Sequence, residues 1–214
     1  MKKHVERTLT AVAVLVALAA GAVAFAWSGL YDIGADVHHW RPAYAFLATV
    51  RDRSIEAHAK HVVVPNLDDP QLILEGAGQY AAMCTGCHLT PGEGDSELRK
   101  GMYPQPPDLS KVHVDPKEAF WIIKHGIKMS AMPAWGMAGH DDPTIWSMVA
   151  FVQKLPGMTP AQYKAIVAKA PPDDDMDMGG DHVHGHADAD MGDMAMPAGA
   201  ATVAAPATAG KPAQ

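Results

Sequence analysis

The stretch MCTGCHLTP, residues 83–91, contains both cysteines of this 214-residue chain, and a histidine directly follows the second. Cys84 and Cys87 are three positions apart and His88 is one further, so on a helix all three side chains project from one side of a single turn. A thiol pair in this arrangement has three chemical uses. It can form a redox disulfide, supply half of a zinc site, or attach a haem through two thioether bonds with His88 as the proximal iron ligand.

The surrounding sequence favours the third use. A closed structural zinc site needs four Cys or His ligands, and no further cysteine or suitably spaced histidine lies nearby. A thioredoxin-like dithiol requires strands around it, and no run of this chain alternates between apolar and polar residues as a strand does. The sequence therefore predicts one covalently attached haem c, bound by Cys84 and Cys87 with His88 on the iron. The absence of stray thiols agrees, because they would compete during attachment.

The segments around this turn are typical of helices joined by loops, so the predicted fold class is all-α. Apolar side chains recur at helical spacing, and Pro or Asp marks several helix starts. The stretch 90–110 is rich in Gly and Pro and is expected to be loop. The expected helices are residues 71–88, 115–127 and 143–155, with a short helix after Pro160 that ends near Ala170.

In several separated places, the stretch from Leu67 to about Met158 resembles a class I c-type cytochrome. The matching pieces follow the order of that family and cover roughly half of the chain. They are EGAGQYAAMCTGCH (75–88), the haem-edge loop PPDLS (106–110), the sixth-ligand loop GIKMSAMPAWG (126–136) and the closing helix WSMVAFVQKL (146–155).

The resemblance implies a cytochrome c-like helical domain wrapped around one covalently attached haem. Gly76 and Tyr80 would then lie where the first and last helices cross, with the glycine letting the two backbones come close. By the same analogy, Ala150 and Phe151 are the opposing contacts.

The resemblance also bears on the surroundings of the axial histidine. A metal-bound imidazole donates the proton of its other nitrogen to an acceptor that sets its orientation and basicity. By resemblance, the acceptor for His88 is the carbonyl of Pro91. Tyr103, Trp121 and Trp135 lie near the two loops in sequence, and they either line the haem pocket or belong to the ordinary core.

A low-spin electron carrier needs a second axial ligand, and a thioether there raises the reduction potential relative to a second imidazole. Met132 is the predicted ligand, because Pro133 directly follows it and restricts the backbone that must hold the sulfur. The resemblance points to the same residue in its MPAW context. Met129 is the main alternative. The other candidates within reach are Met102, Met137, His113 and His125.

The amino-terminal segment predicts a membrane helix. Residues 9–30 contain no charge and only two polar side chains, a length that spans the hydrocarbon core of a bilayer. Lys2, Lys3 and Arg7 precede this run, so the positive-inside tendency places the rest of the chain outside the cytoplasm. The rival interpretation is a cleaved signal peptide, because AFA at 24–26 fits the cleavage pattern. Both interpretations export the haem domain.

Four segments result. Residues 1–30 are an N-terminal membrane anchor or uncleaved signal, and residues 31–65 are a juxtamembrane helical spacer whose apolar pattern suits the membrane surface or the main domain. Residues 66–170 form the cytochrome c domain. Residues 171–214 form an Asp/His/Met-rich tail with few large apolar side chains, which is expected to be disordered.

Charge excludes one class of partner and suggests two others. The net charge of −7 comes from the tail, and nothing resembles the basic face that nucleic acid requires. Six cations between residues 99 and 128 form either a steering patch for an acidic redox partner or a solvated face. In the tail, His182, His184 and His186 lie among methionines, so the tail is either a copper-binding segment or a purely solvating one.

The function expected from the sequence is electron transfer. The chain is predicted to be a membrane-anchored monohaem cytochrome c, with the haem domain in a bacterial periplasm, that relays one electron at a time between respiratory or dehydrogenase complexes. It is not expected to be an enzyme, because both axial positions of the iron are filled. A copper-handling haem protein whose tail binds metal is the alternative, and a haem enzyme of peroxidase type is a third class.

Overall fold

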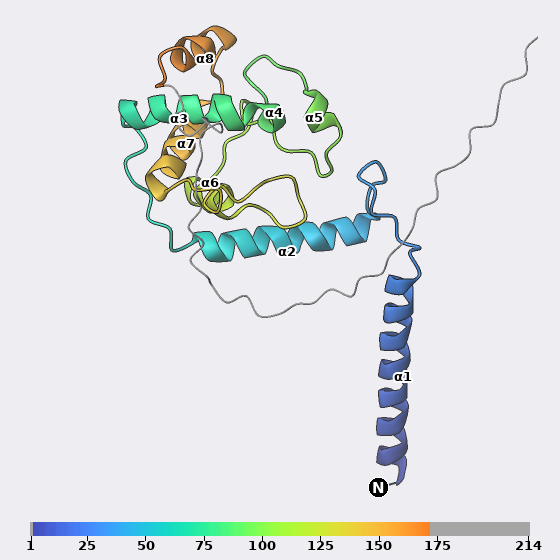
Figure 1. The fold of residues 1–214 in the computed structure, drawn as a ribbon. Helices are drawn as coiled ribbons and strands as arrows, with labels where there is room; N and C mark the ends of the chain where they lie inside the picture. The colour runs from blue at the N-terminus through green and yellow to red at the C-terminus, as the bar shows by residue number, and fades with distance from the viewer. Residues whose placement is uncertain (1, 172–214) are drawn as a thin grey trace, which may run out of the picture. The chain divides into compact units, whose positions relative to one another are not determined.

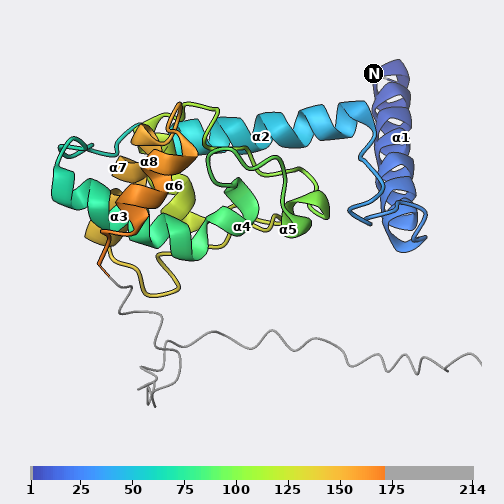
Figure 2. The same ribbon diagram turned by 90° about the horizontal axis from the view of Figure 1, so that it is seen from above.

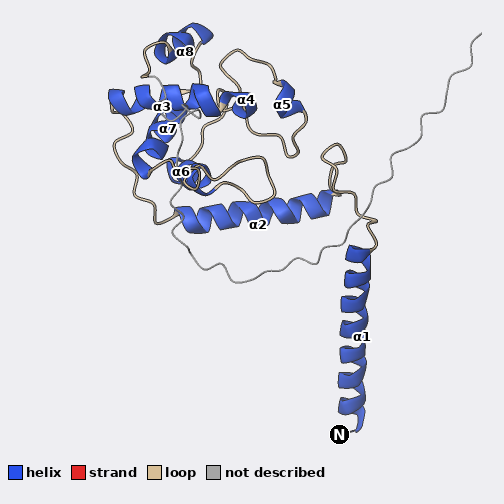
Figure 3. Cartoon of the chain, in the orientation of Figure 1, coloured by secondary structure: helices blue, strands red, loops and turns tan. Residues whose placement is uncertain are grey.

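The computed structural model describes residues 2–171, and these residues form eight helices without a strand (Figures 1 and 3). The prediction of an all-α fold is thus confirmed for this part of the chain. The predicted tail lies outside the described residues, apart from Pro171. The helices are α1 (Lys2–Trp27), α2 (Arg41–Ala59), α3 (Pro70–Met83), α4 (Thr85–His88), α5 (Glu97–Lys100), α6 (Pro116–His125), α7 (Asp142–Lys154) and α8 (Pro160–Val167).

Side-chain caps explain where the helices of the cytochrome domain begin. Asp69, Asp115 and Asp141 each accept hydrogen bonds from backbone N–H groups in the first turn of α3, α6 and α7. Thr159 and Gln162 form a reciprocal capping box at the start of α8. These bonds satisfy amide groups that have no partner within the helix, and a proline occupies one of the first two positions of each helix. The observed helices therefore begin within one residue of most predicted starts.

The core of the domain is the crossing of α3 and α7 (Figure 1). Gly76 lies at the crossing, and a Cβ atom there would collide with the backbone carbonyl of Ser147 and lie 3.0 Å from the Cβ of Phe151. The prediction that Gly76 permits a close approach is confirmed, and Phe151 is one of its contacts. Ser147 is a further close contact, because it lies one helical turn before Phe151 on the same face of α7. The expected contact with Ala150, which is fully buried in α7, stays a prediction.

Two apolar clusters extend this crossing. In the first, the ring of Tyr80 lies 5.4 Å from that of Phe151, and Tyr163 of α8 covers both rings. The second joins α6 to α7, where Phe120 stacks on Trp146 with 4.2 Å between ring centroids. Helix α2 then packs against α6, as both views show (Figures 1 and 2).

Helix α1 is the one helix among residues 2–171 that is long and apolar enough to cross a membrane. It covers Lys2–Trp27 with a mean hydropathy of 2.5 in its most apolar window, and none of its residues is buried. The helix starts before the apolar run 9–30 and ends three residues short of it, because Gly29 adopts a left-handed conformation with φ of 67°. A membrane anchor and a signal sequence are both consistent with these properties.

Candidate haem-binding site

The two cysteines lie at a break between helices. The prediction of one continuous helix over residues 71–88 is wrong, because α3 ends at Met83 and α4 begins at Thr85. Cys84 has φ of −107° and ψ of −28°, and its carbonyl accepts from the N–H groups of both Cys87 (3.2 Å) and His88 (2.8 Å). A tight new turn therefore starts at Cys84 and carries both thiols and the imidazole. This turn, residues 84–88, is the attachment turn.

Both thiols are free and half-buried, as covalent attachment of a cofactor requires. Burial, and secondarily the neighbouring Cys87 thiol, raises the pKa of the Cys84 thiol to about 12. Cys84 packs against the Tyr80 and Phe151 cluster. The attachment turn is thus joined directly to the α3–α7 core, which restricts its position.

The chain reverses immediately after His88. Leu89 is fully buried with φ of 67°, a left-handed conformation that costs a non-glycine residue about 1–3 kcal/mol. The hydroxyl of Tyr80 donates to the carbonyl of Leu89 at 2.6 Å and, more weakly, to that of His88 at 3.2 Å. Burial of the Leu89 side chain and this hydrogen bond offset the backbone strain, and desolvation raises the pKa of Tyr80. Tyr80 therefore fixes the exit of the haem-attachment turn.

The imidazole of His88 is oriented by a proline carbonyl. Its Nδ1 lies 2.9 Å from the carbonyl oxygen of Pro107. A carbonyl can only accept, so Nδ1 carries the proton and Nε2 retains its lone pair for a metal ion. Burial lowers the pKa of His88, opposed by the Pro107 hydrogen bond and assisted by the positive charge of Arg99, which favours a neutral imidazole.

This geometry corrects one expectation. The acceptor implied by the resemblance was Pro91, three residues after His88, and the structure shows Pro107 instead. Pro91 is buried in the turn that follows Leu89. The left-handed Leu89 turns the chain away from the ring, so the long loop returns to His88 only at residues 106–109, where Leu109 N–H also donates to the His88 carbonyl at 3.3 Å.

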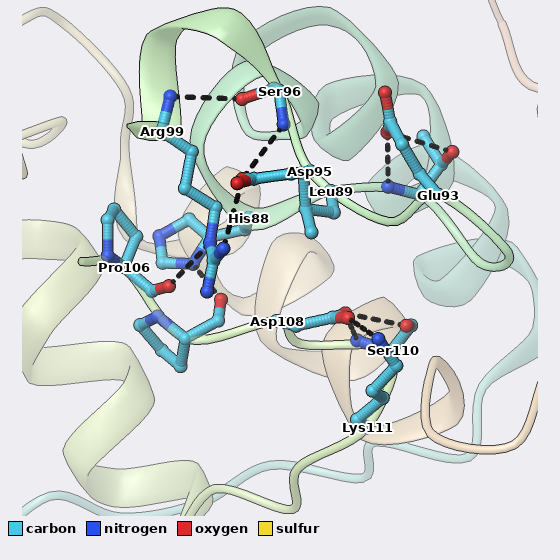
Figure 4. Close-up of polar contacts among 12 residues, drawn as sticks. His88, Leu89, Glu93, Asp95, Ser96, Arg99, Pro106, Asp108, Ser110 and Lys111 are labelled. Atoms are coloured by element: carbon cyan, nitrogen blue, oxygen red, sulfur yellow. Dashed lines mark hydrogen bonds and ion pairs between the residues drawn. The ribbon is translucent and has the colours of Figure 1, made fainter. Parts of the chain in front are cut away.

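The loop segment before Pro107 is held by Arg99 (Figure 4). Its Nε donates to the carbonyl of Pro106 at 3.0 Å, and its Nη1 pairs with Asp95 at 3.0 Å. Only 17% of the Arg99 side chain is exposed, so this pair is shielded from solvent. The Arg99 guanidinium thus links Asp95 to Pro106, the residue directly before Pro107.

Arg99 belongs to α5, a one-turn helix within the stretch 90–110, so the prediction that this whole stretch is loop is wrong here. Ser96 caps it by accepting from the Arg99 N–H at 3.0 Å, and its own hydroxyl donates to the carbonyl of Gly86 inside the attachment turn at 2.5 Å. The sequence contained a weak indication of this helix, because Ser96 is followed by an acidic first residue and two basic last residues. Four residues are too few to show a hydrophobic period.

Asp108 stiffens the loop directly after Pro107. Its carboxylate accepts from the backbone N–H (3.0 Å) and the hydroxyl (2.6 Å) of Ser110 and pairs with Lys111 at 2.6 Å. Burial alone would raise the pKa of Asp108, but the hydrogen bonds from Lys111 and Ser110 outweigh it and hold the pKa below its ordinary value. The acceptor carbonyl therefore lies between two anchored points, Arg99 on one side and Asp108 on the other.

The predicted sixth-ligand loop closes on itself. The Ile127 N–H donates to the Met132 carbonyl at 3.2 Å, and the Met132 N–H donates to the Ser130 hydroxyl at 3.2 Å. Gly126 has φ of 66°, and a Cβ there would lie 2.8 Å from the Met132 carbonyl oxygen, so only glycine fits. Both the N–H and the carbonyl of the half-buried Met132 therefore form hydrogen bonds. A residue whose thioether binds the iron needs a fixed backbone, and these two bonds supply it.

The other sixth-ligand candidates differ from Met132 in exposure. The side chains of Met129 and Met137 are 102% and 91% exposed, so both extend into solvent. His113 and His125 are exposed as well, whereas Met102 is half-buried. The geometry therefore favours Met132 over Met129, and the assignment of His88 and Met132 as axial ligands remains a prediction.

The three aromatic residues near the loops contact other parts of the chain. Tyr103 stacks on His38 with 4.5 Å between centroids, Trp121 lies between His58 and His125, and Trp135 meets His140 edge-on at 5.4 Å. All three are half-buried. Tyr103 and Trp121 thus join α2 and the segment before it to the cytochrome domain.

The cationic patch predicted between residues 99 and 128 is partly neutralised. Three of its six cations form ion pairs, namely Arg99 with Asp95, Lys111 with Asp108, and Lys124 with Asp142. Each of these pairs removes a charge from the field that would steer an acidic partner.

The donor set fits a covalently bound haem. Two free thiols and a neutral imidazole with an available Nε2 lie on one turn, as thioether attachment and axial ligation need. Residues 2–171 contain no cluster of three or more His, Cys, Asp or Glu side chains that could hold a bare metal ion. The tail histidines His182, His184 and His186, proposed for copper, lie outside the described residues.

Together, fold and site define a c-type cytochrome domain, which covers α3 to α7. The family model described as "Cytochrome C oxidase, cbb3-type, subunit III" matches residues 71–152 of the chain. Cys84, Cys87, His88 and Met132 lie within the matched range. No curated protein matches the chain.

Proposed function

We propose that this protein is a membrane-anchored monohaem cytochrome c that relays single electrons between larger respiratory or dehydrogenase complexes. The cytochrome domain supports a haem-based electron-transfer role. The observation that carries the proposal is the attachment turn, where Cys84 and Cys87 flank one helical turn and Pro107 orients His88 so that Nε2 is free for iron. A bound haem supplies one-electron iron chemistry at this turn.

The protein's own contribution is a rigid, low-dielectric setting for that iron. Electron transfer is fastest when neither oxidation state requires rearrangement of the surroundings, and preorganised groups meet this condition. The His88 acceptor loop is anchored by Arg99 and Asp108, and the Met132 backbone is held at both polar groups. If His88 and Met132 both bind the iron, no position would be left open for a substrate, so we propose a carrier rather than an enzyme.

The placement in the cell rests on α1. Its length and apolar character suit a single membrane span, and the basic residues Lys2, Lys3 and Arg7 at its start favour a cytoplasmic amino terminus. We therefore propose that α1 stays in the cytoplasmic membrane and that the haem domain lies in the periplasm.

The proposal is tested on full-length protein made in a bacterium that matures c-type cytochromes. We expect the intact mass to exceed that of the polypeptide by one haem, and the amino terminus to begin at Met1 or Lys2. The ferric protein should show the far-red charge-transfer band of methionine-ligated haem. An unmodified mass, or rapid binding of cyanide or peroxide by an open ferric iron, would contradict the carrier assignment.

A further inference from the structure

Apart from the earlier residues of α1, the exposed large hydrophobic side chains lie mainly in one short part of the chain, which starts at Trp27, the last residue of α1. Ten of them lie between residues 27 and 50, whereas only five lie in all of residues 51–171. Trp27 and Ile33 are each 88% exposed, and Trp40 is 73% exposed. Solvent-exposed apolar groups at this density mark a surface that another apolar phase covers.

Within α2, these side chains form a strip along the first half of the helix. Phe46, Leu47 and Val50 are 68%, 50% and 52% exposed and fall within an arc of about 100° at 100° per residue. Beyond Val50 the exposed surface of α2 becomes charged, with an ion pair between Arg53 and Glu56. The helix is therefore apolar on its outer surface only in the half nearest to α1 in sequence.

The opposite side of α2 is already occupied. Ile55 and Ala59 are buried, α2 packs on α6, and Tyr44 lies 5.9 Å from Tyr103. The Phe46, Leu47 and Val50 strip points away from these contacts by helical geometry. The domain itself thus leaves the strip uncovered.

Aromatic contacts keep the start of α2 close to the end of α1. The ring of Tyr31 lies 6.4 Å from that of Phe25 in α1 and 5.9 Å from that of His39, whose Nδ1 is 2.5 Å from the Tyr31 hydroxyl. Trp40 follows His39 and is the residue directly before α2. Two successive ring contacts therefore connect the apolar helix to His39, which directly precedes Trp40.

We propose that the strip formed by Phe46, Leu47 and Val50, together with Trp40, lies in the outer headgroup layer of the bilayer that contains α1. This inference rests on the proposed function, because it requires α1 to remain as a membrane anchor. The occupant is lipid because ring contacts connect the end of the membrane helix to the residue before Trp40, and Trp40 leads into the strip. Aromatic side chains also concentrate in the headgroup layer, and Trp40 is exposed.

The consequence is a fixed position for the cytochrome domain at the membrane surface. His38 and Tyr44 flank the strip and contact Tyr103 in the loop that leads to Pro106 and Pro107. Embedding α2 would therefore hold that loop, and the attachment turn it touches, near the bilayer instead of letting the domain range freely on a linker.

The test uses full-length, haem-loaded protein in phosphatidylethanolamine and phosphatidylglycerol vesicles. Phe46→Cys and Val50→Cys are spin-labelled after haem attachment, with Ala45→Cys and Ala57→Cys as matched controls. Ala45 lies about 150° around the helix from the middle of the strip, and Ala57 lies in the charged half. If the haem spectrum of one strip variant departs from that of the parent, Leu47→Cys replaces it.

For each spin label, the collision rate with oxygen, which partitions into lipid, is compared with the collision rate with a water-soluble nickel chelate. We expect the logarithm of the oxygen-to-nickel ratio to be positive at the strip positions and negative at both controls. Vesicle flotation, measured on the same samples, reports the anchor. Flotation with negative values at the strip would overturn this inference while leaving the anchor intact, and failure to float would overturn both.

Discussion

The Nδ1 of His88 lies 2.9 Å from the carbonyl oxygen of Pro107, and nineteen residues separate the two in sequence. The acceptor is a backbone atom, so no side-chain substitution removes it directly. Its position depends on Arg99, which binds the preceding carbonyl, and on Asp108, which immobilises the residues that follow. The basicity of the predicted axial imidazole is therefore set by groups outside the attachment motif.

Replacing Arg99 should change the reduction potential of the haem. Arg99→Gln removes a shielded positive charge close to His88. Because loss of this charge stabilises the oxidised iron, the reduction potential should fall by on the order of 50 mV, which is nearly a factor of ten in the equilibrium constant of a one-electron couple. Arg99→Lys keeps the charge but loses the fork that reaches Asp95 and Pro106 together, and it should show less than half of that shift. Spectroelectrochemical titration of both variants measures the effect.

The two variants also separate charge from positioning. A loosened Pro107 carbonyl would alter the imidazole plane, which changes the electron paramagnetic resonance g-values of the ferric haem. We expect such a change in both variants, with the larger potential shift in Arg99→Gln. Equal potentials in Arg99→Gln and the parent would show that this guanidinium does not act on the iron.

Gly76→Ala should destabilise the domain through the helix crossing. The new methyl group would collide with the Ser147 carbonyl, an overpacking cost of about 3 kcal/mol, while the better helix propensity of alanine returns about 1 kcal/mol. The expected net loss of about 2 kcal/mol lowers Tm by roughly 10 °C. Gly94→Ala is the control, because nothing lies within 4 Å of a Cβ there. Equal melting of both variants would argue against this crossing.

Asp108→Asn should alter how stability depends on pH. The folded pKa of Asp108 lies below 3.8, so its contribution is present above that pH and is lost as the pH falls through the lower folded pKa. At pH 6 we expect the parent to exceed the variant by about 1 kcal/mol in free energy of unfolding. This difference should shrink as the pH falls below 3.8. Denaturant titrations of both proteins over this range measure it, and a constant difference would contradict the predicted role of the carboxylate.

Local physics explains why most helix boundaries were predictable. Asp69 and Asp115 stand before a proline, and an acidic cap followed by proline both satisfies the free N–H groups and fixes the first helical φ. At the other end, Pro156 and Gly157 follow the C-cap residue of α7, Leu155. The placement of Cys84, Cys87 and His88 on one turn was predictable for the same reason, since their spacing is that of one helical turn.

The partner of His88 was not predictable from local pattern. Which carbonyl reaches the ring depends on the left-handed Leu89, on the short helix α5, and on the path of a loop of about twenty residues. None of these has a periodic sequence pattern, and φ above zero at a leucine contradicts its intrinsic preference. The resemblance implied Pro91, and in the folded chain the carbonyl of Pro107 lies against the ring instead.

The predicted axial role of Met132 can be tested against Met129, which lies three residues earlier in the same loop. Met132 is half-buried with both backbone polar groups bonded, whereas the Met129 side chain is fully exposed. We expect Met132→Ala to abolish the far-red charge-transfer band and to lower the reduction potential by on the order of 100 mV or more, because the thioether favours the reduced iron. Met129→Ala should leave both properties unchanged.

Since the two substitutions remove the same kind of side chain from one loop, a general loosening of the loop would affect both variants. Only loss of the iron–sulfur bond would affect Met132→Ala alone. Loss of the band in Met129→Ala, with Met132→Ala unaffected, would move the ligand to Met129 and require residues 126–136 to fold differently around the iron.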